Sequence, residues 1–204
     1  MKNNGISGNS MALTPSTMLP LDTALPLFQL PVVRGGQCNS TELDQRPVLL
    51  MVICAHCPFV KHVEPELTRL DADYHQSVQM LAVSSNSLIT HPQDDEAHLA
   101  EQVERHGWRF RYLMDQEQTL AKALNAACTP EFYLFSPDAK NSQTLRYRGQ
   151  LDASRPGNDA PLDGADLRAA LDAALSGHAV STAQVASVGC NVKWHPGQEP
   201  AWFG

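Results

Sequence analysis

The chain alternates between short apolar runs and longer segments in which apolar residues recur at helical spacing. The runs at 47–53 and 78–83 are continuous, as expected of strands that are covered on both faces. Shorter strands bounded by turn residues are predicted at 25–31, 110–114, 132–135 and 144–148.

Helical periodicity starts after the first buried run, at Cys57, and places Val60 and Leu67 on one face of a helix. Pro65 lies inside this pattern and predicts a kink or an early end. The element order is βαβαβ followed by ββα, which predicts an α/β fold with a central sheet and helices on both faces. Further helices are predicted over 94–106, 117–127 and 166–175.

The two ends of the chain lack this patterning. Residues 1–19 begin with a stretch rich in Asn, Ser, Gly and Thr and are predicted to form a flexible N-terminal tail. Residues 20–177 are predicted to form one domain, and residues 178–204 are predicted to be a C-terminal extension of irregular structure.

Composition narrows the function classes. The 204 residues carry a formal charge of -7 and contain no basic run, which argues against nucleic acid and anionic membranes as partners. No apolar run approaches the ~20 residues of a membrane span, and the N-terminus shows no signal-peptide core, so a cytoplasmic location is expected. Nothing in the sequence calls for a cofactor.

Cysteine spacing supplies the candidate chemistry. The five cysteines are odd in number and too few for a disulfide scaffold, and only Cys54 and Cys57 have motif spacing. In a chain of this size, such a pair indicates redox or metal chemistry. Two buried core cysteines are the plainer alternative. A zinc site would require a second close Cys/His pair. His62 is in reach on the helix, but Cys128 and Cys190 are isolated.

The Cys54–Cys57 pair lies where a strand turns into a helix, and a helix N-terminus favours a thiolate. Cys54 is expected on the exposed turn as the attacking thiolate, with Cys57 one turn into the helix as the resolving sulfur. His56 lies between them, where its ring could hydrogen-bond to the Cys54 thiolate and make the disulfide more oxidising.

A second element is Thr129-Pro130, directly before a predicted strand. Such a pair is often a simple strand boundary. Alternatively, a cis proline would place the Thr129 backbone beside the dithiol, where it could pair with a partner peptide. The residues by themselves leave both interpretations open.

Together these motifs resemble the thioredoxin-fold superfamily, in particular its peroxiredoxin-like, AhpC/TSA-related redoxin branch with a Cys-x-x-Cys motif. The resemblance spans about residues 20–200 and implies a thioredoxin fold, a Cys54/Cys57 redox pair and a cis peptide at Thr129-Pro130. The motifs that carry it are Cys54-Ala-His-Cys-Pro-Phe-Val-Lys-His62, Ala127-Cys-Thr-Pro-Glu-Phe-Tyr-Leu-Phe135, the segment 147–157 and Gly189-Cys-Asn-Val-Lys-Trp194.

The resemblance leaves three activities to compare. A thiol–disulfide oxidoreductase would act on protein or small-thiol partners and need an electron donor. A peroxidase would use the family pattern Pro-x-x-x-Thr-x-x-Cys and a distant arginine, but Met51 replaces the threonine when the count starts from Cys54. Thiolates also suit Cu(I), so a metal- or partner-binding module is the third reading. Disulfide exchange is favoured.

The remaining cysteines are secondary candidates. Cys128 precedes the Thr129-Pro130 element, and Cys190 lies in a tail that shares a family motif. Each is a candidate extra redox thiol, and the plain alternative for each is an inert thiol. Cys38 is predicted to be inert.

Overall fold

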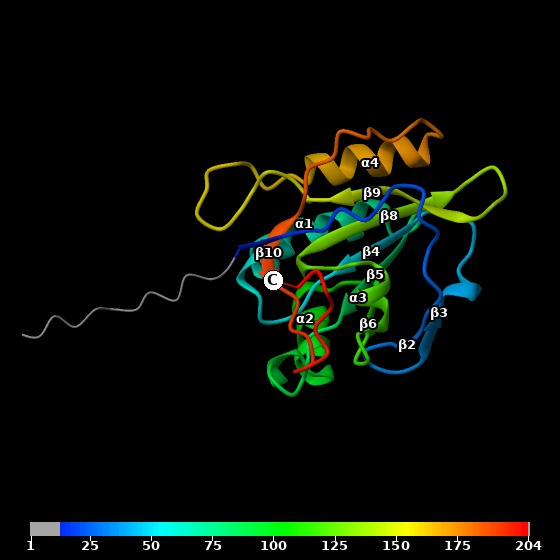
Figure 1. Cartoon of the computed structure of the whole chain (residues 1–204). Helices are drawn as coiled ribbons and strands as arrows, with labels where there is room; N and C mark the ends of the chain where they lie inside the picture. The colour runs from blue at the N-terminus through cyan, green and yellow to red at the C-terminus, as the bar shows by residue number, and fades with distance from the viewer. Residues whose placement is uncertain (1–12, 204) are drawn as a thin grey trace, which may run out of the picture.

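The computed structural model describes residues 13–203. A five-stranded mixed sheet forms the centre of the protein (Figure 1). Strand β4 runs parallel to β5 and antiparallel to β8, and β5 and β6 are parallel. The predicted α/β thioredoxin-like fold with flanking helices is confirmed. The strands lie in the order β6 (Arg111–Met114), β5 (Gln79–Ser84), β4 (Val48–Val52), β8 (Glu131–Pro137) and β9 (Gln143–Gly149).

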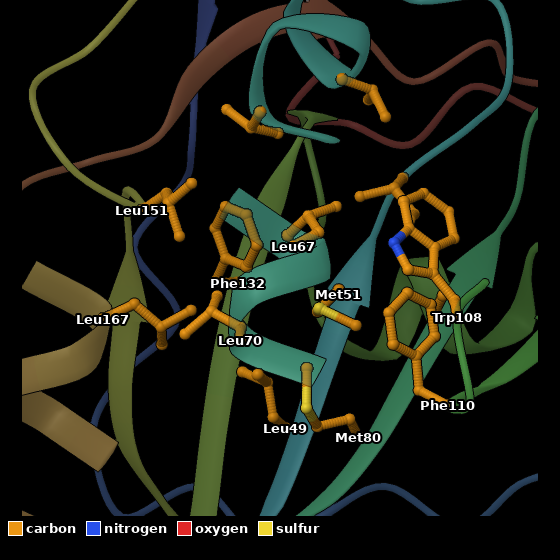
Figure 2. Packing of buried hydrophobic residues seen from close by; sticks show 14 of the residues in the cluster. Leu49, Met51, Leu67, Leu70, Met80, Trp108, Phe110, Phe132, Leu151 and Leu167 are labelled. Atoms are coloured by element: carbon orange, nitrogen blue, oxygen red, sulfur yellow. The ribbon is translucent and has the colours of Figure 1, made fainter. Parts of the chain in front are cut away.

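Helices cover both faces of this sheet because its central strands are apolar on both sides. On one face, Leu67 and Leu70 of α1 pack with Leu49 and Met51 of β4, as Figure 2 shows. On the other, Leu120 at the start of α3 joins the second core cluster. The helices are α1 (Pro58–Tyr74), α2 (Glu96–His106), α3 (Thr119–Ala123) and α4 (Ala165–Leu175), with 3-10 turns at Ser40–Glu42 and Pro92–Asp94.

Helix α1 continues past Pro65 for its full 17 residues, so the predicted early end is wrong. Proline removes one backbone hydrogen bond, which costs about 3 kcal/mol in a helix interior. Buried apolar side chains on both sides of it, among them Val63 and Leu67, favour the helix by more than that cost. The burial of the periodic apolar side chains therefore outweighs the cost of Pro65 within the helix.

Both ends of the described chain join one small sheet. Strand β10 (Val188–Asn191) lies between β1 (Leu13–Pro15) and β7 (Cys128–Thr129). Residues 13–15 are therefore an ordered strand, contrary to the predicted flexible tail, because pairing with β10 satisfies their backbone. Residues 1–12 of that tail lie outside the described residues.

The predicted 25–31 strand shortens to β2 (Gln29–Pro31), which pairs with β3 (Gln37–Asn39). The predicted 117–127 helix likewise shortens to α3. Beyond β10, the C-terminal extension returns to the core and buries Trp194. None of the helices within residues 13–203 has the length and apolar composition to cross a membrane.

Replacing Leu67 with alanine tests the packing of α1 on the sheet. Leu67 is fully buried, so Leu67→Ala is expected to lower the free energy of unfolding by about 2–5 kcal/mol. Leu27→Ala is the matched control, because Leu27 is 83% exposed and its loss should cost less than about 0.5 kcal/mol. Urea denaturation measures both, and equal losses would contradict the packing described.

Candidate active site

A buried carboxylate holds the turn between β4 and α1. Asp94 Oδ1 accepts the backbone amides of Ala55 (2.9 Å) and His56 (3.2 Å). Its Oδ2 accepts the side-chain amide of Asn86 at 2.8 Å and lies 2.5 Å from His56 Nδ1. Burial raises the pKa of Asp94, but the hydrogen bonds from His56 and Asn86 outweigh it, so the pKa lies below its usual value. The charged form of Asp94 thus fixes the backbone between the two cysteines.

The ring of His56 is directed at Asp94 and stacks on His91, with ring centroids 5.0 Å apart. Within residues 13–203, no hydrogen bond joins this ring to a sulfur. The expectation that His56 hydrogen-bonds to a Cys54 thiolate is therefore wrong. A carboxylate oxygen is a far stronger acceptor than a thiol, and Asp94 lies within reach.

Cys57 lies directly before α1, and Pro58 is the first helical residue. Proline favours this position because its missing amide hydrogen has no partner there in any helix. The predicted placement of Cys57 one turn inside the helix is wrong for this reason. Its sulfur instead lies at the positive end of the helix dipole.

The pKa values of the two cysteines move in opposite directions. Hydrogen bonds from the thiols of Cys190 and Cys54 lower the pKa of Cys57 well below its usual value, although burial opposes this. Burial raises the pKa of Cys54, and the charge of Asp94 acts in the same direction. These directions favour the anion on Cys57, whereas the sequence predicted it on an exposed Cys54. The structure buries Cys54 completely.

Thr129 faces both cysteines from the opposite side. The Thr129–Pro130 peptide is cis, as the family resemblance implies. The Thr129 hydroxyl lies 3.7 Å from Cys54 Sγ, and its carbonyl oxygen lies 3.4 Å from Cys57 Sγ. Of the two interpretations that the sequence left open, the one that places the Thr129 backbone beside the dithiol is the observed one.

Cys190 of β10 completes this cluster of thiols. It pairs with Thr129 in the antiparallel ladder and belongs to the same buried cluster as Cys54 and Cys57. Hydrogen bonding to Cys57, with burial, raises the pKa of Cys190 and keeps it protonated. The C-terminal extension thus brings Cys190, which the sequence indicated as a candidate extra redox thiol, to the dithiol.

Cys128 is held differently. Its thiol lies 3.9 Å from both the Pro130 carbonyl and Glu131 Oε2, and burial raises its pKa. The backbone amides of Ala127 and Cys128 also donate to Glu131 Oε2, at 3.0 and 3.3 Å. The hydrogen bonds of the Cys128 thiol are therefore to residues 130–131. Cys38 lies in a different core cluster from Cys54, Cys57 and Cys190. All five cysteines are free thiols.

Comparison with known proteins identifies the family of this chain. The profile of the AhpC/TSA family matches residues 21–146. The chain belongs to the AhpC/TSA family. An uncharacterized conserved protein from Geobacillus kaustophilus is 41% identical, with a TM-score of 0.86 over 91% of this chain and 98% of its own. A hypothetical protein from Sinorhizobium meliloti is 39% identical, with a TM-score of 0.85 over 90% of this chain and 100% of its own.

More distant structures share the fold of this AhpC/TSA protein. A secreted Mycobacterium tuberculosis disulfide oxidoreductase is 15% identical, with a TM-score of 0.54 over 70% of this chain and 93% of its own. No curated protein sequence matches the chain. The family and fold indicate thiol-based redox chemistry.

A polar network behind the turn was missed by the sequence analysis. The Gln102 side-chain amide donates to the Cys54 carbonyl (3.4 Å) and to Glu64 Oε1 (2.8 Å), and His106 Nε2 lies 2.9 Å from Glu64 Oε2. Glu64 and Gln102 both lie among the apolar positions of their helices. A polar residue on an otherwise buried helix face is the signal that could have indicated them.

The thiol, imidazole and carboxylate of Cys54, His56 and Asp94 offer ligand atoms within 4.8 Å of one another. A cysteine that binds a metal ion must be deprotonated, whereas burial raises the pKa of Cys54 and favours its protonated form. Both oxygens of Asp94 already accept hydrogen bonds from the turn and from Asn86. This donor set is built to hold a turn and suits thiol chemistry better than a metal ion.

Replacing Glu131 with glutamine should change how stability depends on pH. Burial raises the pKa of Glu131 from 4.5 to about 7, so its contribution to stability is fully present below about pH 4.5 and is lost as the pH rises through about 7. Glu131→Gln is expected to remove that loss, which is worth about 1–3 kcal/mol.

Urea denaturation between pH 4 and about pH 8.5 measures the effect. Glu117→Gln is the control, because Glu117 is an exposed glutamate of the same charge. A pH slope that is the same in Glu131→Gln and wild type would contradict the assignment.

Proposed function

We propose that this AhpC/TSA protein is a thiol–disulfide oxidoreductase whose redox pair is Cys57 and Cys54. The observation that carries the proposal is the pair of free thiols at the start of α1, with both sulfurs against Thr129 beside the cis proline. Hydrogen bonds from the thiols of Cys190 and Cys54 lower the pKa of Cys57, which supports Cys57 as the thiolate. A thiolate is the nucleophile of disulfide exchange, and a neighbouring thiol is needed to resolve the mixed disulfide.

The reaction proceeds in two exchanges. The Cys57 thiolate attacks a substrate disulfide, forms a mixed disulfide and releases one substrate thiolate. The proton of Cys54 passes to that thiolate, and the resulting Cys54 thiolate attacks the Cys57 sulfur. The second substrate thiolate leaves. Cys54 and Cys57 have then lost two electrons to the substrate and are joined by a disulfide. A reducing dithiol partner restores the pair.

The directions of the two pKa shifts favour the reverse of the roles expected from the sequence, where Cys54 attacks and Cys57 resolves. Helix dipole, thiol hydrogen bonds and Thr129 all favour the anion on Cys57. His56 acts as a positioning residue in this scheme, since its amide and its ring bind the Asp94 carboxylate that fixes the turn. Disulfides of proteins or small thiols are the proposed substrates.

A thiol peroxidase is the second candidate, and membership of the AhpC/TSA family favours it. With Cys57 as the thiolate, the family pattern expects threonine and proline where Cys54 and Leu50 lie. Within residues 13–203, no arginine hydrogen-bonds to Cys54 or Cys57. Without such groups, a peroxide O–O bond would receive little electrostatic assistance as it breaks. Disulfide exchange is therefore the better fit.

Cys57→Ser is expected to lower the reduction of insulin disulfides by about 100-fold or more, because it removes the nucleophile. The assay is turbidity of insulin with dithiothreitol as the electron donor. Cys38→Ala is the matched control, since Cys38 is also buried but lies in the other core cluster. Wild-type activity in Cys57→Ser would refute the proposed function.

Reaction with hydrogen peroxide is expected to be slow, with a second-order rate constant within about tenfold of a free thiolate. The missing peroxide-orienting groups are the reason. Stopped-flow mixing with excess peroxide, followed by mass spectrometry for sulfenic acid, measures the rate. A constant several orders of magnitude higher would favour the peroxidase instead.

A further inference from the structure

The backbone edge beside the cis proline is already occupied. Strand β10 pairs antiparallel with β7, with Cys190 opposite Thr129 and Asn191 opposite Cys128. The amide of Val192 extends the pairing through a 2.9 Å hydrogen bond to the Ala127 carbonyl. An extended polypeptide that bound by strand addition beside the dithiol would need this same edge.

Gly189 allows the approach. A Cβ atom at this position would lie 2.1 Å from the Thr129 carbonyl oxygen and 2.8 Å from its carbon. Any residue other than glycine would push β10 away from the Thr129 edge. The contact between the C-terminal segment and the active site is thus built for close packing.

Close packing brings the Cys190 sulfur against Cys57. The two thiols share a buried cluster with Cys54, and Cys190 lies opposite Thr129, whose carbonyl oxygen is 3.4 Å from the Cys57 sulfur. Hydrogen bonding with Cys190 also lowers the pKa of Cys57. Cys57 therefore has two neighbouring thiols, one from its own turn and one from β10. A sulfur in this position can also attack a mixed disulfide on Cys57.

Strand β10 is held at its ends and covered along its outer edge by a short strand. Beyond its C-terminal end, Lys193 is fixed by hydrogen bonds with Asn86 (2.8 Å), Ser87 (2.7 Å) and Gln118 (2.9 Å). Its outer edge is covered by β1, a strand of three residues that includes Pro15. Before its N-terminal end, the Ser187 hydroxyl donates to the Gly149 carbonyl at 2.5 Å. The strand is therefore held beyond both of its ends, and its short outer cover, β1, is where local opening can begin.

We propose that β10 occupies the strand position of a substrate polypeptide and that Cys190 exchanges disulfides with Cys57. This rests on the proposed function and specifies its substrate as an extended protein segment. Binding of the segment displaces β10, which exposes the buried Cys57. Return of β10 to the Thr129 edge then brings Cys190 to the mixed disulfide and releases the product.

The step balances without a further reactant. The Cys57 thiolate attacks the substrate disulfide, and one substrate thiolate leaves and takes the proton of Cys190. The Cys190 thiolate then attacks Cys57, the bond from Cys57 to the substrate breaks, and the second substrate thiolate leaves. Two electrons have passed from Cys57 and Cys190 to the substrate disulfide.

Disulfide mapping tests the role of Cys190. The full chain and its Cys54→Ser and Cys190→Ser variants are oxidised with glutathione disulfide, quenched with acid and N-ethylmaleimide, and analysed by peptide mass spectrometry. A Cys57–Cys190 linkage is expected in the full chain, and it should accumulate in Cys54→Ser. If folded Cys54→Ser yields only a glutathione adduct on Cys57, the role of Cys190 is refuted.

The two proposals fail in different ways. Retained insulin reduction in Cys57→Ser would overturn the oxidoreductase function whatever linkage is mapped. An inactive Cys57→Ser together with a lone Cys54–Cys57 disulfide would overturn only the role of β10.

Gly189→Ala tests the occupied edge, because the added methyl must move β10. The rate at which iodoacetamide alkylates Cys57 is expected to rise about tenfold or more. The rate is measured at its high-pH plateau, where Cys57 is fully ionised and a change in its pKa does not affect the result. Val188→Ala is the matched control, since it changes the same strand without adding an atom against Thr129. Circular dichroism establishes that both variants are folded. An unchanged rate in Gly189→Ala would refute the displacement.

The substrate class has its own measurement. A peptide Val-Gly-Cys-Asn joined by a disulfide to glutathione copies β10, and the protein is expected to reduce it about tenfold faster than glutathione disulfide. Equal rates would refute the polypeptide assignment.

Discussion

The lowered pKa of the buried Cys57 thiol depends on the elements that surround its sulfur. Burial disfavours an anion unless donors surround it, and here the thiols of Cys54 and Cys190 supply hydrogen bonds while α1 directs its dipole at the sulfur. One of these donors belongs to β10. The stability of the thiolate and the position of the C-terminal strand are therefore linked, because loss of either weakens the other.

The donors can only converge if the backbone at the site is held in place from several directions. Asp94 fixes the turn between the cysteines through two amide hydrogen bonds, and Thr129 lies against both sulfurs from β7. Gly189 then lets β10 approach the same carbonyl. Three segments far apart in the sequence thus meet around the turn that carries the two cysteines.

Local patterns predicted much of this architecture. Continuous apolar runs indicated β4 and β5, since strands buried on both faces need apolar side chains at every position. Cysteine spacing located the dithiol, because a strand, a turn and a helix start are all properties of neighbouring residues. Pro65 was misread, since the free energy of burying α1 depends on the sheet it covers and not on its own sequence.

By itself, then, the sequence determined the α/β fold class, the family and the placement of two thiols at a strand-to-helix turn, all of which follow from residues close together in the chain. Only the tertiary structure decided which thiol carries the charge and what His56 binds. Cys57 is stabilised by a thiol from residue 190, and His56 is bound by a carboxylate from residue 94. The strength of a hydrogen bond falls off within a few ångströms, so its partners are decided by which residues folding brings together and not by their spacing along the chain.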